Sequence, residues 1–339
     1  LFMRIVILTI FLIIGISACQ KTSYEILVLN GLTMGTTYSV KINADNAFVE
    51  KNKISNDIDE ILSEINQSMS TYIKESELSN INYSTISDWQ SISDDLFEVI
   101  NHAINVSLKT NGAFDITIAP LVNLWGFGPD KLQNKIPTDE IIELTKKNTG
   151  YKKISIDKSL KMISKLEPNL HIDLSGIAKG FAVDKIARYL DKCGFKNYLV
   201  EIGGELIGKG LNKDKEIWQI GIDNPNNNSD RIKRIIQLED MAMATSGNYM
   251  NYFEKDGIRY SHTINPVTGR PIKHKLASVT VLDSSTMNAD ALATAFMVLG
   301  PEKALSLANN LEIALYLIIK NGERFEEKYN DYFMPYLSD

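Results

Sequence analysis

The sequence predicts an α+β fold in which antiparallel sheets pack against helices. Short apolar runs, each bounded by turn residues, follow one another closely enough to form hairpins, and segments of helical periodicity lie between groups of them. Strands joined by hairpins are antiparallel, so this order favours α+β over a doubly wound parallel sheet. With 339 residues, 44% of them hydrophobic, the chain can bury the core of one large domain or two intimately packed ones.

The amino-terminal part is predicted to form a hairpin followed by helices. Alternating apolar residues predict strands at residues 25–29 and 33–42. Asn30 and Gly31 between these runs are typical of a turn. Apolar residues at helical spacing predict helices at residues 47–69, 94–110 and 137–149. Ser93 and Thr138 stand where N-caps of the second and third helix are expected.

The remaining chain alternates strands with helices and contains no internal repeat. Strands are predicted at residues 153–156, 161–164, 170–174, 198–202, 218–222, 234–238, 278–282 and 314–319. Helices are predicted at residues 177–190, 288–299 and 301–309. Cys193 and Gly194 are typical of the end of the first of these helices.

The opening segment has the layout of a bacterial secretion signal. Arg4 precedes an apolar run that is too short for a membrane span of ~20 residues, and Ser17, Ala18 and Cys19 follow it. Ile16 to Cys19 resembles a lipobox, in which the cysteine is acylated and becomes the first mature residue; a plain signal peptide is the alternative. We therefore expect a signal peptide at residues 1–18, a lipid-anchored tether and first strand at 19–30, and the functional domain at 31–339. Cys193 is then left without a disulfide partner in an oxidising compartment.

Charge and simple motifs exclude several functions. A net charge of −6 makes nucleic-acid binding unexpected, because phosphate neutralisation needs a basic face. The run from Gly203 to Lys209 has most of a phosphate-binding loop, but Gly210 stands where Ser or Thr must bind Mg²⁺. The sequence contains no Gly-x-Ser-x-Gly elbow, and no two of its four histidines are four residues apart.

The segment Asp173-Leu-Ser-Gly-Ile-Ala-Lys-Gly180 combines groups that suit a phosphate and a hard cation. It offers a carboxylate, a glycine that permits close approach, backbone amides at a helix start and Lys179 in the first helical turn. The alternative is an ordinary strand, turn and helix with a capping Asp173 and a surface lysine.

Two further segments carry polar groups at useful spacing. Asp290 and Thr294 are four residues apart, so their oxygens share one face of a helix and could bind Mg²⁺ or Ca²⁺ together with a backbone carbonyl. His262, in the loop Ser261-His-Thr-Ile-Asn-Pro-Val-Thr-Gly269, could act as a base. A polar helix start and a hairpin loop with an exposed histidine are the respective alternatives.

Taken together and in order, these segments resemble the FAD:protein FMN transferase (ApbE) family. The resemblance rests on Met34-Gly-Thr-Thr-Tyr38, Tyr72, Gly112-Ala-Phe-Asp115, Asp173-Leu-Ser-Gly-Ile-Ala-Lys-Gly-Phe-Ala-Val-Asp184, Ile202-Gly-Gly204, Thr245-Ser-Gly247, Ser261-His-Thr-Ile-Asn-Pro266, Thr268-Gly-Arg270 and Asn288-Ala-Asp-Ala-Leu-Ala-Thr294. These segments extend from about residue 34 to 300. Two positions depart from the family pattern: Asn265 and Glu205 stand where Asp is frequent.

The resemblance implies a two-lobed fold and a Mg²⁺-dependent enzyme that joins the FMN half of FAD to a Thr or Ser hydroxyl of a target protein and releases AMP. It implies flavin-nucleotide contacts from Met34, Tyr72, Ala113, Phe114, Asp115, Asp173, Lys179 and Ile264. It implies metal ligation by the Gly176 carbonyl, Asp290 and Thr294, with His262 near the acceptor hydroxyl and Asp290 also catalytic. It further implies acceptors among flavoprotein subunits of membrane redox complexes, and an enzyme in the bacterial cell envelope that faces the periplasm. Hydrolysis of FAD with water as acceptor, or flavin binding without catalysis, remain alternatives.

Overall fold

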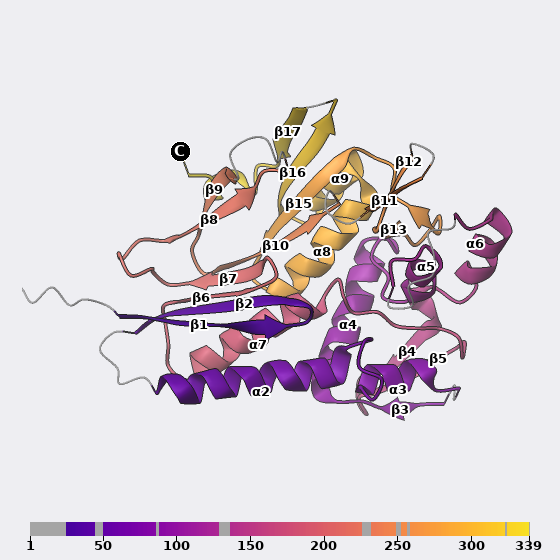
Figure 1. The fold of residues 1–339 in the computed structure, drawn as a ribbon, viewed down its shortest axis with the longest axis horizontal. Coiled ribbons are helices and arrows are strands. Elements are labelled where there is room, and N and C mark those ends of the chain that lie inside the picture. Colours follow the sequence, from indigo (N-terminus) through magenta and orange to yellow (C-terminus); the bar gives the residue numbers. More distant parts are fainter. Residues whose placement is uncertain are drawn as a thin grey trace, which may run out of the picture.

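An eight-stranded antiparallel sheet organises the larger of two lobes in the computed structural model (Figure 1). The structure describes residues 25–44, 50–85, 88–128, 136–225, 232–248, 252–255, 258–322 and 324–338. In spatial order the strands are β1 (Glu25–Thr33), β2 (Thr36–Ala44), β6 (Tyr198–Ile202), β7 (Glu205–Lys209), β10 (Met241–Gly247), β15 (Leu276–Asp283), β16 (Ala314–Asn321) and β17 (Arg324–Tyr329). Every neighbouring pair is antiparallel, as the sequence predicts.

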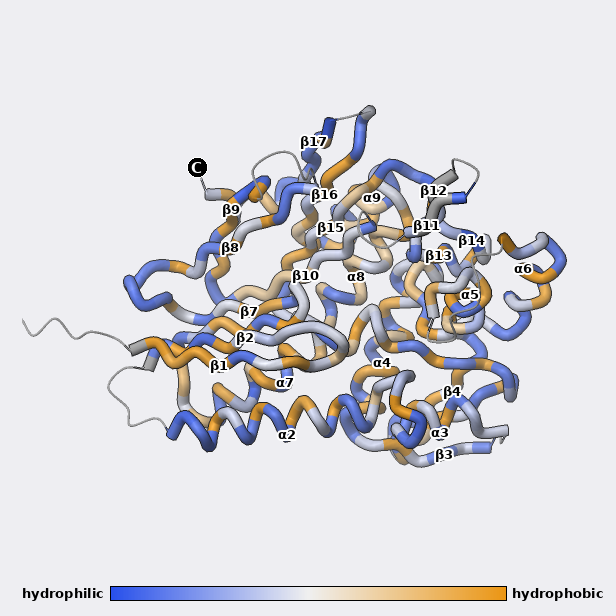
Figure 2. The backbone as a smooth tube through the Cα atoms, viewed as in Figure 1, coloured by the Kyte–Doolittle hydropathy of each residue, from blue (hydrophilic) through white to orange (hydrophobic). Residues whose placement is uncertain are grey.

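Helices and a hairpin cover opposite faces of this sheet. The main hydrophobic core lies between one face and the helices α2 (Lys51–Met69), α7 (Ala178–Lys192), α8 (Thr286–Leu299) and α9 (Pro301–Asn310). A second core lies under the hairpin of β8 (Trp218–Asp223) and β9 (Ile232–Leu238) and the short helix η2 (Met334–Tyr336). Hydrophilic and hydrophobic colours alternate along α2 in Figure 2, because only one of its faces is buried. No helix in the described ranges is long and apolar enough to cross a membrane.

The smaller lobe is built from short elements at the right of Figure 1. Its strands are β3 (Gln90–Ser91), β4 (Ile154–Asp157) and β5 (Met162–Lys165), which form one sheet, and the hairpins β11 (Tyr252–Lys255) with β12 (Ile258–Ser261) and β13 (Ile264–Asn265) with β14 (Arg270–Pro271). Its helices are α3 (Glu77–Tyr83), α4 (Asp94–Lys109), α5 (Ala119–Leu124), α6 (Asp139–Lys146) and η1 (Tyr151–Lys153). The two predicted N-caps are confirmed, since the hydroxyls of Ser93 and Thr138 accept from the N–H groups of Leu96 and Ile141.

The first hairpin turns later than the sequence predicts. Asn30 and Gly31 lie inside β1 and pair with β2, and the turn falls at Met34 and Gly35. Both turn residues have positive φ, 50° and 74°, which suits a two-residue hairpin. Gly31 serves a different purpose, because a Cβ there would lie 2.4 Å from the ring of Tyr38.

The predicted strand at residues 170–174 is also wrong. This segment joins no sheet, because a side chain satisfies its backbone groups. The buried amide of Asn82 accepts from Ile172 N–H at 2.7 Å and donates to its carbonyl at 2.8 Å. Asp173 N–H then donates to the carbonyl of Ile116 at 2.7 Å. The segment is therefore fixed just before Asp173 without a strand neighbour.

The contact between α7 and α8 is closer than side chains ordinarily permit. A Cβ at Gly180 would lie 2.4 Å from the carbonyl oxygen of Thr286. The carboxylate of Asp184 accepts from the N–H groups of Thr286 and Met287 and from the hydroxyl of Ser285, so a side chain of α7 caps α8. Gly180 and Asp184 thereby fix where α8 begins relative to α7.

We expect Gly180→Ala to lower the free energy of unfolding by about 1–3 kcal/mol, because the added methyl group must push two packed helices apart. Lys192→Ala, on the exposed end of the same helix, is the control and should change this free energy by less than about 0.5 kcal/mol. Urea unfolding followed by circular dichroism measures both. Equal stability of Gly180→Ala and the wild type would show that the contact can relax.

Candidate functional site

Two adjoining cavities lie between the small lobe and the large one, where the β1–β2 and β6–β7 turns, the end of β10 and the helices α2, α7 and α8 contribute to their walls. The first has a volume of about 450 Å³ and the second about 650 Å³, and they share Tyr72, Asp173 and Lys179. The predicted site residues that line the first cavity are Tyr72, Ala113, Phe114, Asp115, Asp173, Gly176, Lys179, His262, Ile264, Asp290 and Thr294. Met34 lines only the second, from the turn between β1 and β2. Cys19 lies outside the described residues.

Asp290 lies on the wall formed by α7 and α8. Its side chain is buried, and one carboxylate oxygen accepts from Gly180 N–H at 3.0 Å. Burial raises the pKa of Asp290, while the nearby ammonium group of Lys179 and the Gly180 N–H oppose the rise. Such a carboxylate has lost most of its hydration, so it gains strongly from a cation placed beside it.

Thr294 follows Asp290 by one helical turn and faces Gly176. A Cβ at Gly176 would lie 3.1 Å from Thr294 Oγ1 and 3.3 Å from the ring of Phe114, so any larger residue would crowd the threonine hydroxyl. Ser246 Oγ is a further 3.4 Å neighbour of the threonine hydroxyl. The wall therefore presents a carboxylate, a hydroxyl and an adjacent backbone segment, all oxygen donors.

The oxygen donors of Asp290, Thr294 and the Gly176 backbone suit a hard cation whose remaining coordination positions are filled by water or substrate. No group of three or more His, Cys, Asp or Glu side chains within the described ranges could hold a metal ion by itself. Mg²⁺ is commonly bound by one or two carboxylates together with water and substrate phosphates. One carboxylate beside a hydroxyl and a carbonyl is consistent with that mode and not with a zinc site.

Lys179 and Glu205 form an ion pair beside the same wall. Lys179 Nζ lies 2.5 Å from Glu205 Oε1, and the other oxygen of Glu205 is buried with no hydrogen-bond partner among the described residues. Burial raises the pKa of Glu205 to about 8, and the charge of Asp290 adds to the rise while Lys179 opposes it. Burial lowers the pKa of Lys179, but Asp290 and Glu205 outweigh this and raise it overall, so the ammonium form persists.

Asp115 and Asp173 fix the backbone around the cavities. Asp115 is buried and accepts from the N–H and hydroxyl of Thr117 and from the N–H of Tyr151. Its pKa is raised by burial, against these three hydrogen bonds. Asp173 accepts from Ser175 N–H at 2.8 Å, which shapes the turn leading to Gly176.

Aromatic residues flank the opening between the cavities. Tyr72 is 76% exposed, and it belongs to the lining of both cavities. Phe114 is 4% exposed and forms part of the floor beside Gly176. A planar ring system entering the first cavity would therefore have Phe114 below it and Tyr72 at its edge.

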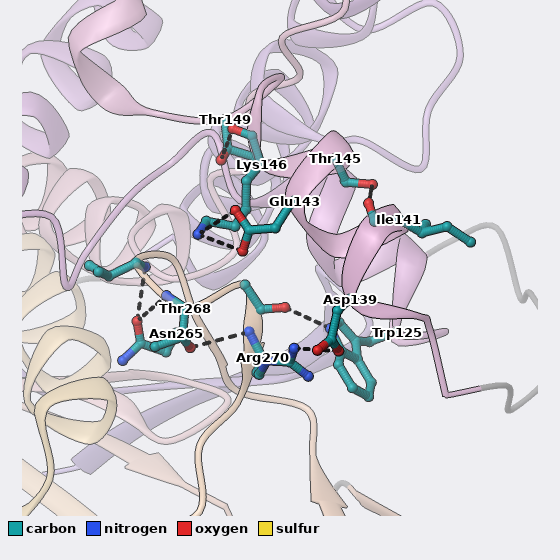
Figure 3. A network of polar contacts seen from close by, with 12 residues as sticks. Trp125, Asp139, Ile141, Glu143, Thr145, Lys146, Thr149, Asn265, Thr268 and Arg270 are labelled. Atoms are coloured by element: carbon teal, nitrogen blue, oxygen red, sulfur yellow. Dashed lines mark hydrogen bonds and ion pairs between the residues drawn. The ribbon is translucent and has the colours of Figure 1, made fainter.

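The loop that carries His262 and Ile264 is held by the small lobe, as Figure 3 shows for its far end. Trp125 Nε1 donates to the carbonyl of Gly269 at 2.8 Å, and Arg270 pairs with Asp139 at 2.6 Å. Ile264 is buried among the apolar residues of α5 and α6. His262 lies edge-on to Phe127 with ring centroids 6.4 Å apart, and it lines the first cavity.

Asn265, one of the two predicted departures from the family pattern, shapes this loop. Its side-chain oxygen accepts from the N–H groups of Val267 and Thr268 at 2.9 and 3.2 Å (Figure 3). An amide and a carboxylate can both accept these bonds, so the substitution preserves the turn.

Sequence reasoning missed three residues that organise the site. It noted Glu205 only as a departure, although the residue pairs with Lys179 in the cavity wall. It gave no role to Asn82, which holds the segment before Asp173, or to Asp184, which caps α8. Both Asn82 and Glu205 are buried, which only the fold reveals.

Sequence comparison with known proteins identifies the family of this chain. A family model described as "ApbE family" matches residues 34–317. The chain belongs to the ApbE family. It is 44% identical over 323 residues to the FAD:protein FMN transferase of Vibrio cholerae, covering 95% of this chain and 96% of that protein. It is 43% identical over 327 residues to the enzyme of the same name from Haemophilus influenzae, covering 95% and 94%.

Solved structures of ApbE proteins share the fold. The flavin transferase ApbE from Vibrio cholerae superimposes with a TM-score of 0.86 at 43% identity, covering 93% of this chain and all of that one. The apo form of the Pseudomonas stutzeri flavinyl transferase ApbE gives a TM-score of 0.86 at 37% identity, covering 93% of this chain and 97% of that one. These matches confirm the predicted α+β, two-lobed ApbE fold.

The raised pKa of Glu205 predicts how stability depends on pH. The native state holds the carboxyl proton of Glu205 up to about pH 8, whereas a glutamate in the unfolded chain loses it near the ordinary glutamate pKa of 4.5. Native protein thus binds more protons than unfolded protein between these values, and the contribution of Glu205 to stability falls as pH rises through that window. We expect Glu205→Gln to become progressively more stable relative to the wild type between pH 5 and 8.

Urea unfolding at pH 5, 6.5, 8 and 9 tests this expectation. Glu64→Gln, which removes an exposed carboxylate of α2, controls for the loss of one negative charge. A stability difference between Glu205→Gln and the wild type that stays constant over the whole range would contradict the assigned pKa.

Proposed function

We propose that this ApbE protein transfers FMN from FAD to a Thr or Ser hydroxyl of a target protein, in a Mg²⁺-dependent reaction that releases AMP. The observation that carries the proposal is the meeting of two cavities at Lys179. FAD consists of two ring systems joined through a diphosphate. Two cavities that meet at the positively charged Lys179 match that arrangement, with the diphosphate at Lys179 and one ring system in each cavity.

Mg²⁺ would be held by Asp290, Thr294 and the carbonyl of Gly176. The donor set fits, because all three ligands are oxygens and Gly176 has no side chain to crowd the Thr294 hydroxyl. Bound there, the ion would supply stabilisation of the negative charge that develops on the diphosphate oxygens. Lys179 shares this task from its place between Asp290 and Glu205, where its ammonium form is favoured.

The transfer step forms one bond and breaks one. The acceptor oxygen attacks the phosphorus of the FMN half, the bond from that phosphorus to the bridging oxygen breaks, and AMP leaves with the bridging oxygen. The proton of the acceptor hydroxyl must be removed, because a neutral hydroxyl is a weak nucleophile. His262 lines the first cavity and is the residue we assign to accept it.

Cleavage with water as the acceptor is the second candidate. It uses the same diphosphate site and differs only in which hydroxyl reaches the phosphorus. Tyr72 is exposed at the lining of the first cavity, where a polypeptide side chain or water could enter. The relatives are named FAD:protein FMN transferases, which favours transfer over hydrolysis.

We also propose that the protein is anchored to the cell envelope by lipid on Cys19 and faces the periplasm, where its acceptors are flavoprotein subunits of membrane redox complexes. The support is the sequence pattern of residues 4–19. In a bacterial host, the wild type should take up radiolabelled palmitate and sediment with membranes, whereas Cys19→Ser should do neither. Labelling of Cys19→Ser equal to that of the wild type would overturn the anchor assignment.

Variants of the two α8 ligands test the proposed reaction. We expect Asp290→Asn to reduce FMN transfer at least about a hundredfold, because it removes the only carboxylate from the metal site. Thr294→Val should also reduce transfer and raise the Mg²⁺ concentration needed, while Thr294→Ser, which keeps the hydroxyl, should retain most activity.

The assay incubates FAD, Mg²⁺ and an acceptor, then measures the mass of the acceptor and the released AMP and FMN. A gain of one FMN per acceptor supports transfer. Free FMN with an unmodified acceptor would assign hydrolysis instead, and FAD that remains intact would assign binding without catalysis. Full activity of Asp290→Asn would overturn the metal site.

A further inference from the structure

A third cavity, of about 390 Å³, lies beside the first and has three lysines in a lining that is otherwise largely apolar. Its lining includes Lys273, Lys275 and Lys320 together with Asn248 and Ser261, and no Asp or Glu of the described ranges belongs to it. We call it the lysine cavity. A local excess of positive charge is unexpected on a chain with a net charge of −6.

The fold brings these lysines close to one another. Lys320 N–H donates to the carbonyl of Lys275 at 2.8 Å, so adjacent ends of β15 and β16 place two lysines next to each other. All three side chains are exposed, and within the described ranges none forms an ion pair. Like charges side by side on neighbouring strands are destabilising, and an anionic partner would relieve this repulsion.

The lysine cavity shares a wall with the first cavity. Gly247 and His262 line the first cavity, whereas the next residue of one strand, Asn248, and the preceding residue of the other, Ser261, line the lysine cavity. Successive residues of an extended chain lie about 3.3 Å apart. A polypeptide that presents a hydroxyl at His262 can therefore place a side chain a few residues away over the lysine cavity.

We propose that the lysine cavity binds acidic side chains of the acceptor protein close to the residue that is modified. The proposal rests on the proposed function, since only a transferase needs a macromolecular acceptor beside His262. The two charges are complementary, and the cavity would orient the acceptor while leaving the diphosphate site untouched. It would also offset the repulsion between an acidic acceptor and an enzyme of net charge −6.

A paired charge experiment tests the proposal on the whole protein. The acceptors are two synthetic peptides with one threonine, flanked by glutamates in one and by glutamines in the other. The variant is Lys273→Gln with Lys275→Gln. The control is Lys51→Gln with Lys53→Gln, which makes the same change of net charge on exposed positions of α2.

We expect the Lys273/Lys275 variant to raise KM for the glutamate peptide about tenfold, with kcat and the KM for FAD unchanged. The control variant should alter KM by less than about twofold. For the glutamine peptide, wild type and variant should have the same KM. The difference on the glutamate peptide should shrink in 0.5 M NaCl, because salt screens exposed charges.

Other outcomes would overturn the proposal. If the Lys273/Lys275 variant left KM unchanged, or raised it equally for both peptides, the lysines would not bind acidic side chains of the acceptor. If the wild type bound vesicles containing anionic lipid more strongly than the Lys273/Lys275 variant did, and the peptide KM did not differ between them, the cavity would be a membrane-binding site instead.

A binding measurement separates this proposal from the proposed function. Fluorescence anisotropy of the labelled glutamate peptide with wild-type protein needs no catalysis, and the Lys273/Lys275 variant should weaken this binding while the Lys51/Lys53 control should not. Absence of binding to the wild type overturns the docking proposal, whereas binding without transfer overturns only the proposed function.

Discussion

The contact between α7 and α8 determines where the chemically important groups of this protein lie. Gly180 has no side chain to hold the helices apart, so its N–H reaches the buried carboxylate of Asp290 at 3.0 Å. One turn later Asp184 caps α8 through two backbone N–H groups and a hydroxyl. These hydrogen bonds fix where α8 begins and how it is rotated relative to α7. Thr294 then lies one helical turn beyond Asp290 on the same face of α8.

The charged side chains of this wall are stabilised by one another rather than by contact with water. Lys179 lies between two buried carboxylates, one on α8 and the other, Glu205, at the start of β7. The carboxylates keep the lysine charged, and the lysine makes their burial tolerable. Because Glu205 keeps its proton up to about pH 8, the charges that oppose each other at neutral pH are those of Asp290 and Lys179. A divalent cation beside Asp290 would supply the further positive charge that an anionic diphosphate needs.

The sequence predicts the parts of the site whose signal is local. Asp290 and Thr294 could be placed on one helix face from their spacing, and Lys179 in the first turn of a helix, because helical periodicity is a short-range property. The family resemblance then identified which polar clusters belong together, and the comparisons confirm the family and the fold.

Other features depend on contacts between distant segments and could not be read in the same way. Residues 170–174 have the composition of a strand, yet their partner is the side chain of Asn82, which lies 90 residues from Ile172. The first hairpin turns at Met34 rather than at Asn30 because pairing of Thr33 with Thr36 sets the register. Glu205 gains its importance from burial beside Lys179, which no local pattern encodes.

Diffraction from crystals soaked with Mn²⁺ and FAD, with anomalous data collected at the manganese edge, tests the central claim most directly. The account predicts an anomalous peak within coordination distance of Asp290, Thr294 Oγ1 and the Gly176 carbonyl, with the diphosphate of FAD between this peak and Lys179. A manganese peak outside this wall, or FAD bound with its diphosphate away from Lys179, would contradict it.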